Sequence, residues 1–251
     1  MSRRPFVAGN WKMHKTAAEA VAFVDALAGR IPAAVDVAVC APFTALAETA
    51  RVAAGSGIAV YAQNMHQAEK GAFTGEVSAA MLLAAGVNGV LVGHSERRQL
   101  FGETDAAVNS KVARAHAAGL QVILAVGETA AERETELTEQ VLERQVAAGL
   151  EGLDSEQVAA TTLAYEPIWA IGTGLTATPQ IAQAAHAFIR GRVAELHGVG
   201  ERVRIQYGGS VKPENAADLF VQPDIDGGLI GGASLEAKSF IELVKAADAA
   251  K

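Results

Sequence analysis

The chain has 251 residues, of which half are hydrophobic and a fifth are charged, a composition typical of a globular protein and not of a disordered one. Its net charge of −7 argues against a nucleic-acid partner, which requires a basic surface, and means that an anionic substrate must be attracted by local groups. The single cysteine, Cys40, excludes an intramolecular disulfide, and the lack of a long apolar run, at Met1–Arg4 or elsewhere, predicts a cytoplasmic protein without a membrane span.

Short apolar runs alternate with longer Ala-rich segments of helical period. Continuous apolar runs are typical of parallel strands covered on both faces, so the alternation predicts an α/β fold. We expect one single-domain (β/α)8 barrel over residues 1–251, with a closed parallel sheet of eight strands and outer helices. A doubly wound open sheet is the alternative, although the Gly-rich turn common near its start is absent. The expected strands are Phe6–Ala8, Val35–Ala41, Ile58–Ala62, Gly89–Val92, Gln121–Val126, Thr161–Tyr165, Val203–Gln206 and Gly227–Ile230.

Helix-start signals lie between these runs. Thr16 and Glu19 form a capping-box pattern ahead of an apolar stripe. Thr178 and Pro179 supply an N-cap and a proline at the first helical position, and Pro213 opens another short helix. The last helix carries the apolar stripe Phe240, Ile241 and Val244.

Unusual polar and glycine residues follow the strands. In a (β/α)8 barrel the functional residues lie at the carboxyl ends of the strands, so these residues should meet on one face of the barrel. They follow six of the eight strands: Asn10 and Lys12 the first, Gln63 and Asn64 the third, His94-Ser95-Glu96 the fourth, Glu166 the sixth, Gly208-Gly209-Ser210 the seventh, and Gly231-Gly232 the eighth.

Glu166 ends the sixth strand and is followed by Pro167, which favours an extended conformation for the acid. The apolar loop 168–174 comes next and carries two glycines. Taken alone, this stretch favours an ordinary turn with a solvent-facing acid. Its place among the other strand ends favours a general base beneath a lid.

At these residues the chain closely resembles the triosephosphate isomerase family, over essentially its whole length. The resemblance implies a TIM barrel aldose–ketose isomerase of glycolysis and gluconeogenesis, which interconverts dihydroxyacetone phosphate and D-glyceraldehyde 3-phosphate through an enediolate. Neither a Walker motif nor a metal-ligand cluster is apparent, so we expect no cofactor and no metal. The matching motifs are AGNWKM (8–13), GAFTGEVS (71–78), GHSERR (93–98), AYEPIWAIGTG (164–174), YGGSV (207–211) and Gly231-Gly232.

The resemblance assigns roles to the polar residues. Glu166 is the base, and burial under a closed lid should raise its basicity. His94, kept neutral at the start of a helix, is the electrophile, while Lys12 and Asn10 stabilise the enediolate. Glu96 positions Lys12 or His94, unless it is only a surface acid.

The resemblance also implies a metal-free phosphate site and a closing lid. Backbone N–H groups at Gly172, Ser210, Gly231 and Gly232 should converge on the phosphate. Tyr207 and Ser210 should hold the lid, residues 167–177, by hydrogen bonds to its tip. The lid and its supports include Pro167, Ile168, Trp169, Ala170, Ile171, Thr173, Gly174 and Tyr207.

The long segment after the third strand is either a floppy loop or, as the resemblance implies, a dimer contact. In a homodimer Thr74 would enter the partner subunit near its Lys12 and His94, which would make dimerisation necessary for activity. Pairing of dimers into a larger assembly stays open. The expected interface residues are Gln63, Asn64, Thr74 and Glu76.

Two residues depart from the family pattern. Ala125 stands where Cys is frequent, which predicts a small packing defect near Glu166. Leu175 stands where Lys is frequent, which should change the solvation of the lid hinge. Two other functions stay open: an inactive barrel that only binds phosphorylated molecules, and an isomerase of a larger sugar phosphate.

Overall fold

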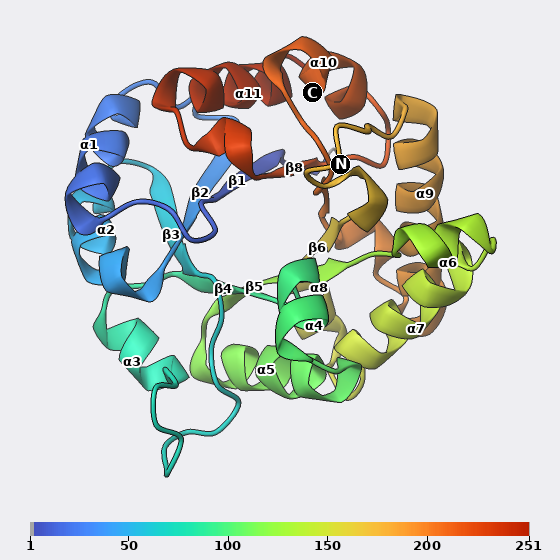
Figure 1. Cartoon of the computed structure of the whole chain (residues 1–251), viewed down its shortest axis with the longest axis horizontal. Helices are drawn as coiled ribbons and strands as arrows, with labels where there is room; N and C mark the ends of the chain where they lie inside the picture. The colour runs from blue at the N-terminus through green and yellow to red at the C-terminus, as the bar shows by residue number, and fades with distance from the viewer. Residues whose placement is uncertain (1–2, 251) are drawn as a thin grey trace.

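The computed structural model describes residues 3–250; the part of the N-terminal prediction that rests on Met1 and Ser2 lies outside this range. Its strands form a closed barrel in which every neighbour is parallel and follows the order of the chain (Figure 1). The predicted barrel is confirmed. The strands are β1 (Phe6–Asn10), β2 (Asp36–Ala41), β3 (Ile58–Ala62), β4 (Gly89–Val92), β5 (Gln121–Val126), β6 (Thr161–Tyr165), β7 (Ile205–Tyr207) and β8 (Gly227–Ile230).

The barrel is closed by pairing of β1 with β8, where Phe6 lies opposite Gly227. Arg3 strengthens this contact, because its Nε donates to Asp226 Oδ1 at 2.9 Å. Three strands differ from the predicted bounds, and the smallest difference is that β2 begins at Asp36 instead of Val35. β1 extends to Asn10, which pairs with Cys40 of β2, and β7 begins only at Ile205.

Helices surround the barrel, and the predicted helix starts are confirmed. Thr16 and Glu19 form the capping box of α1, and Thr178 caps α9 with Pro179 in its first turn. The α-helices are α1 (Ala17–Leu27), α2 (Leu46–Ala53), α3 (Ala79–Ala84), α4 (Ser95–Phe101), α5 (Asp105–Ala118), α6 (Ala130–Glu134), α7 (Thr138–Leu150), α8 (Ser155–Ala160), α9 (Pro179–His197), α10 (Pro213–Phe220) and α11 (Ala237–Ala249), and the 3-10 turns are η1 (Phe43–Ala45), η2 (Ile168–Ala170), η3 (Gly200–Arg202) and η4 (Gly232–Ser234).

Two apolar layers hold these elements together. One lies between strands and helices, and the other fills the barrel interior with small side chains such as Ala8 and Ala164 interleaved with large ones such as Tyr61. Cys40 belongs to the interior layer as a small hydrophobe, and burial raises the pKa of its thiol to about 12. Within residues 3–250, no helix has the length and apolarity to cross a membrane.

Candidate active site

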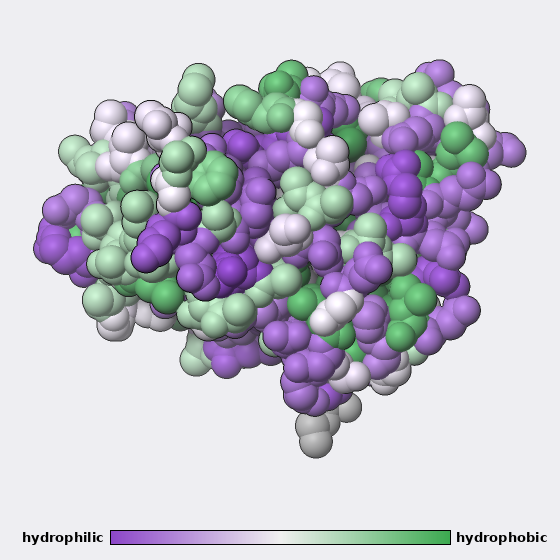
Figure 2. Space-filling model, turned by 90° about the horizontal axis from the view of Figure 1, so that it is seen from below, coloured by the Kyte–Doolittle hydropathy of each residue, from purple (hydrophilic) through white to green (hydrophobic). Residues whose placement is uncertain are grey.

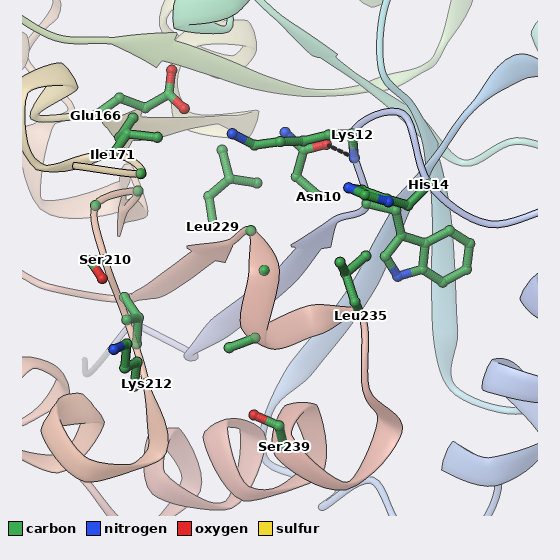
Figure 3. A pocket seen from close by; sticks show the side chains of 18 of the residues that line it. Asn10, Lys12, His14, Glu166, Ile171, Ser210, Lys212, Leu229, Leu235 and Ser239 are labelled. Carbon is green, nitrogen blue, oxygen red and sulfur yellow. Dashed lines mark hydrogen bonds between the residues drawn. The ribbon is translucent and has the colours of Figure 1, made fainter. Parts of the chain in front are cut away.

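One pocket of about 580 Å³ lies at the carboxyl ends of the strands (Figure 3). Figure 3 shows the Lys12 side chain extending above Leu229 toward the side on which Glu166 lies. The barrel therefore joins residues that are far apart in the chain. The predicted residues that line the pocket are Asn10, Lys12, His94, Glu166, Ile171, Gly172, Ser210, Gly231 and Gly232.

Glu166 follows β6 and is only 2 % exposed. Its Oε1 lies 2.9 Å from His94 Nε2, and its Oε2 accepts the Ser95 N–H at 2.9 Å. Burial raises the pKa of Glu166, but His94, the Ser95 N–H and Lys12 outweigh it and hold that pKa below its usual value. The raised pKa that we expect for Glu166 under a closed lid is therefore not found in this arrangement. Here both carboxylate oxygens have a partner, His94 for one and the Ser95 N–H for the other.

His94 caps α4, and its Nδ1 accepts the Glu96 N–H at 3.2 Å. A proton on Nδ1 would oppose this bond, so the contacts select the neutral ring with its proton on Nε2, facing Glu166. Burial lowers the pKa of His94, yet the Glu166 carboxylate raises it above its usual value. That raising effect depends on the contact between the two side chains and weakens whenever Glu166 turns away.

Lys12 is held by groups from three strand ends. Its Nζ donates to Glu96 Oε1 at 2.5 Å, and its backbone N–H donates to Asn10 Oδ1 at 3.0 Å. Gln63 Nε2 donates to the Lys12 carbonyl at 2.8 Å and to the Cys40 carbonyl at 2.9 Å. Lys12 also has a φ of 51°, an uncommon conformation for a residue with a side chain. These contacts fix the loop that carries the ammonium group.

The phosphate-binding residues predicted after β7 and β8 lie on one side of the pocket. Ser234 Oγ donates to the Gly231 carbonyl at 2.7 Å and steadies the turn η4. This turn packs so closely on β1 that a β-carbon at Gly9 would lie 2.9 Å from Ser234 Cβ. Lys12 Cε would lie 3.7 Å from a β-carbon at Gly231. The aliphatic part of the Lys12 side chain therefore lies beside Gly231.

The tip of the predicted lid is exposed in this structure. Gly172 and Gly174 are exposed and have φ values of 69° and 83°, which glycine adopts without strain. Within residues 3–250 the buried Tyr207 hydroxyl has no partner at hydrogen-bond geometry. Burial raises the pKa of Tyr207 to about 12, while the nearby Ala177 N–H lowers it. The predicted bonds from Tyr207 and Ser210 to the lid tip are not formed here.

Glu128, which the sequence did not single out as functional, anchors the start of the lid. This fully buried acid accepts the Trp169 indole N–H at 2.8 Å and the Tyr165 hydroxyl at 3.0 Å. The guanidinium of Arg133 stacks over the Trp169 ring at 4.3 Å. Glu128 lies two residues after the end of β5. That position could have marked it in the sequence, because the other candidate site residues also follow the ends of strands.

The two departures from the family pattern have different surroundings. Ala125 is fully buried in the barrel interior, and its carbonyl accepts an N–H of Arg98 at 3.3 Å. Leu175 is 59 % exposed and lines a second hollow beside the lid, next to Trp169. Neither lines the main pocket.

The expected interface residues fall into two groups. Thr74 and Glu76 are exposed on the loop between β3 and α3, which projects from the barrel at the lower left of Figure 1. Gln63 is engaged with the Lys12 loop, and Asn64 Oδ1 accepts Lys111 Nζ at 2.8 Å. Within the chain, Gln63 thus supports the Lys12 loop, whereas Asn64 is bonded to α5.

A closed barrel that gathers a carboxylate, an imidazole and an ammonium beside a glycine-lined wall defines an enzyme for proton transfer on a small anionic substrate. A model of the family described as "Triosephosphate isomerase" matches residues 5–247. The chain belongs to the triosephosphate isomerase family.

Curated relatives cover nearly the same length. The triosephosphate isomerase of Syntrophotalea carbinolica is 56% identical over 97% of this chain and 98% of its own. The triosephosphate isomerase of Carboxydothermus hydrogenoformans is 54% identical over 97% of this chain and 98% of its own length. The triosephosphate isomerase of Thiobacillus denitrificans is 54% identical over 98% of this chain and 99% of its own length.

Proposed function

We propose that this enzyme interconverts dihydroxyacetone phosphate and D-glyceraldehyde 3-phosphate, as an aldose–ketose isomerase. The observation that carries the proposal is the contact of Glu166 with His94 in a pocket that Lys12 and Gly231 also line. The acid can take a carbon-bound proton, while the two nitrogen donors face the oxygens where negative charge develops.

Proton transfer begins when substrate draws Glu166 away from Ser95 and His94. Glu166 removes a proton from the carbon next to the carbonyl, leaving an enediolate. His94 donates a hydrogen bond from Nε2 to the substrate oxygens, and Lys12 and Asn10 stabilise the same charge. Glu166 then returns the proton to the neighbouring carbon while the hydroxyl proton passes from one substrate oxygen to the other, so no electron acceptor is needed. Glu96 positions Lys12 through their ion pair.

The lid protects the enediolate. Closure brings Gly172 to the phosphate, which Ser210, Gly231 and Gly232 hold from the other side. Tyr207 and Ser210 then bond the lid tip. Phosphate elimination competes with reprotonation, and a closed site that excludes water and fixes the phosphate suppresses it. A short substrate is favoured over a larger sugar phosphate, because the lid must reach the phosphate while Glu166 reaches the reacting carbon.

The active form is a homodimer. A hollow of about 290 Å³ opens beside Lys12 and Glu96, and exposed Met13, Phe43 and Phe101 are among the residues that line it. Figure 2 shows the side from which the 63–78 loop projects, with hydrophobic patches set among hydrophilic ones. The hollow is suited to receive Thr74 of a second copy. Residues 1–251 form one catalytic domain, and the enzyme works in the cytoplasm.

The replacement Glu166→Gln tests the base. It keeps the size of the side chain but removes its proton affinity, so turnover in a coupled isomerase assay should fall by about 10²–10⁴-fold. Glu214→Gln is the matched control, because Glu214 lines the same pocket and has no role in the proposed steps. Undiminished turnover of Glu166→Gln would remove Glu166 from the base role.

Binding measurements separate the enzyme from an inactive barrel. Wild type should bind a two-carbon phosphate carboxylate, which mimics the enediolate, and should turn over triose phosphate. Binding without turnover would favour the inactive barrel. Failure to bind the mimic would count against the small-triose substrate.

A further inference from the structure

Lys15 has an unusual backbone conformation for a residue with a long side chain. It lies between β1 and α1 with a φ of 72°, and the only other non-glycine residues of 3–250 with positive φ are Lys12 and Glu136. Crowding of the β-carbon disfavours this region for all residues except glycine. Such a conformation persists when the surrounding contacts determine it.

Those contacts converge on the ammonium group of Lys15. Its Nζ donates to the Leu235 carbonyl at 2.8 Å. The same nitrogen lies 4.8 Å from the centre of the Phe23 ring and 5.5 Å from that of Trp11. The two rings meet edge to face at 5.2 Å. A cation above two aromatic rings is held by their electron-rich faces, so the position of the nitrogen is fixed from several sides.

Leu235 connects this cation to the phosphate side of the pocket. Its backbone N–H donates to the Gly232 carbonyl at 3.1 Å and closes the turn η4. Leu235, Gly231 and Gly232 line the pocket (Figure 3), whereas Lys15 does not. The Lys15 ammonium therefore restrains the far end of the turn whose near end faces the phosphate position.

We propose that Lys15 is a positioning residue for the phosphate-binding turn, which it holds through the Leu235 carbonyl without touching the substrate. The inference rests on the proposed function, because it takes Gly231 and Gly232 as phosphate donors. Loss of the ammonium group should loosen η4 and weaken phosphate binding, while the proton-transfer groups on β4 and β6 keep their geometry.

The test compares Lys15→Met with wild type. Met keeps an apolar stem over Trp11 and Phe23 but has no donor for Leu235. We expect KM for triose phosphate and the dissociation constant of inorganic phosphate to rise by about fivefold, which is within the range for the loss of one ordinary hydrogen bond, because Lys15 is partly exposed and acts on the phosphate indirectly. The kcat for triose phosphate and the kcat/KM for unphosphorylated D-glyceraldehyde should stay within twofold.

Two further variants make the result specific. Lys15→Arg keeps a cation and a donor and should restore phosphate affinity to within twofold of wild type. Lys245→Met removes a positive charge from the exposed face of α11 and should leave phosphate affinity unchanged, which controls for the change in net charge.

The outcomes are distinguishable. Unchanged phosphate affinity in Lys15→Met overturns the inference, as does an equal loss of activity toward D-glyceraldehyde, which would mean general damage. If wild type itself does not bind inorganic phosphate, the proposed phosphate site fails and this inference with it.

Discussion

Two buried histidines of this enzyme have pKa values shifted in opposite directions, because burial lowers both and only one of them faces a carboxylate. His94 faces the Glu166 carboxylate, which raises its pKa despite burial. His186 is fully buried, its Nδ1 lies 3.1 Å from the Asp224 carbonyl, and burial lowers its pKa to about 3. A carboxylate stabilises the imidazolium, whereas a carbonyl compensates little for lost water. Contact with Glu166 thus makes His94 easier to protonate, whereas His186 stays neutral.

His186 predicts a dependence of stability on pH. Its folded pKa of about 3 lies below the unfolded value of about 6.5, so the unfolded chain binds the proton more tightly. The contribution of neutral His186 to the free energy of unfolding is therefore fully present above the unfolded pKa and is lost as the pH falls below that pKa. Between pH 7.5 and 5.5 it should remove about 1.4 kcal/mol from the free energy of unfolding.

Denaturant unfolding of wild type and His186→Gln at both pH values measures this contribution. Gln can still donate to the Asp224 carbonyl but does not titrate, so the gap between the two proteins should narrow by about 1.4 kcal/mol at the lower pH. A gap that is independent of pH would show that His186 does not titrate on unfolding. The comparison cancels the contributions of His94 and of His116, whose pKa burial lowers.

Among the elements, the start of the lid is fixed and its tip is free. Trp169 is tied to Glu128 and stacked under Arg133, and Thr173 Oγ1 donates to the Trp169 carbonyl at 2.7 Å. Within residues 3–250, the exposed glycines 172 and 174 make no hydrogen bond of this kind. We therefore propose that closure of the lid moves its tip about a fixed first turn.

Trp169→Phe tests that arrangement. Phe preserves the ring beneath Arg133 but leaves Glu128 with one hydrogen bond fewer, which should weaken the hinge by about 1.5–3 kcal/mol. We expect kcat/KM for triose phosphate to fall by about tenfold or more, and the fraction of turnovers that release inorganic phosphate to rise. Glu128→Gln keeps an acceptor and should have a smaller effect. Equal phosphate release in Trp169→Phe and wild type would separate this bond from lid function.

Local sequence predicted the elements and the strand-end residues well, because their causes are local. Pro167 marks the end of β6, and that strand delivers Glu166 to the pocket. The contact of Glu166 with the Ser95 N–H could not be predicted, since it depends on how the ends of two strands face each other. The hydrogen bond between Lys15 and Leu235 joins loops 220 residues apart. No pattern in the local sequence indicates such a contact.

For the whole molecule, the net charge of −7 and the apolar residues around the hollow beside Lys12 and Glu96 bear on the same question, the assembly of the protein. Met13 is 94 % exposed in the single chain, beside Lys12. The net negative charge of the protein repels an anionic substrate, so attraction depends on the Lys12 ammonium group. Covering the edge of the pocket beside Lys12 excludes solvent, and solvent then screens this attraction less. A partner subunit seated here would cover that rim.

Light scattering tests the assembly. Wild type should have twice the mass of one chain, and Met13→Glu should dissociate into monomers with reduced activity, because it buries an unpaired charge in the contact. Leu196→Glu, on α9 and 43 % exposed, should remain dimeric. A monomeric wild type with full activity would contradict the proposed homodimer, and a mass of four chains would show that dimers pair.

The pairing of β1 with β8 also determines when the protein can finish folding. Of the eight strands, β1 leaves the ribosome first and its partner β8 leaves it last. Until residue 230 has emerged, one edge of β1 has N–H and C=O groups without their final partners, the kind of edge that pairs with other chains. The barrel can close only after β8 has been made, so nascent or prematurely terminated chains that lack β8 expose an unpaired strand edge at which chains can aggregate.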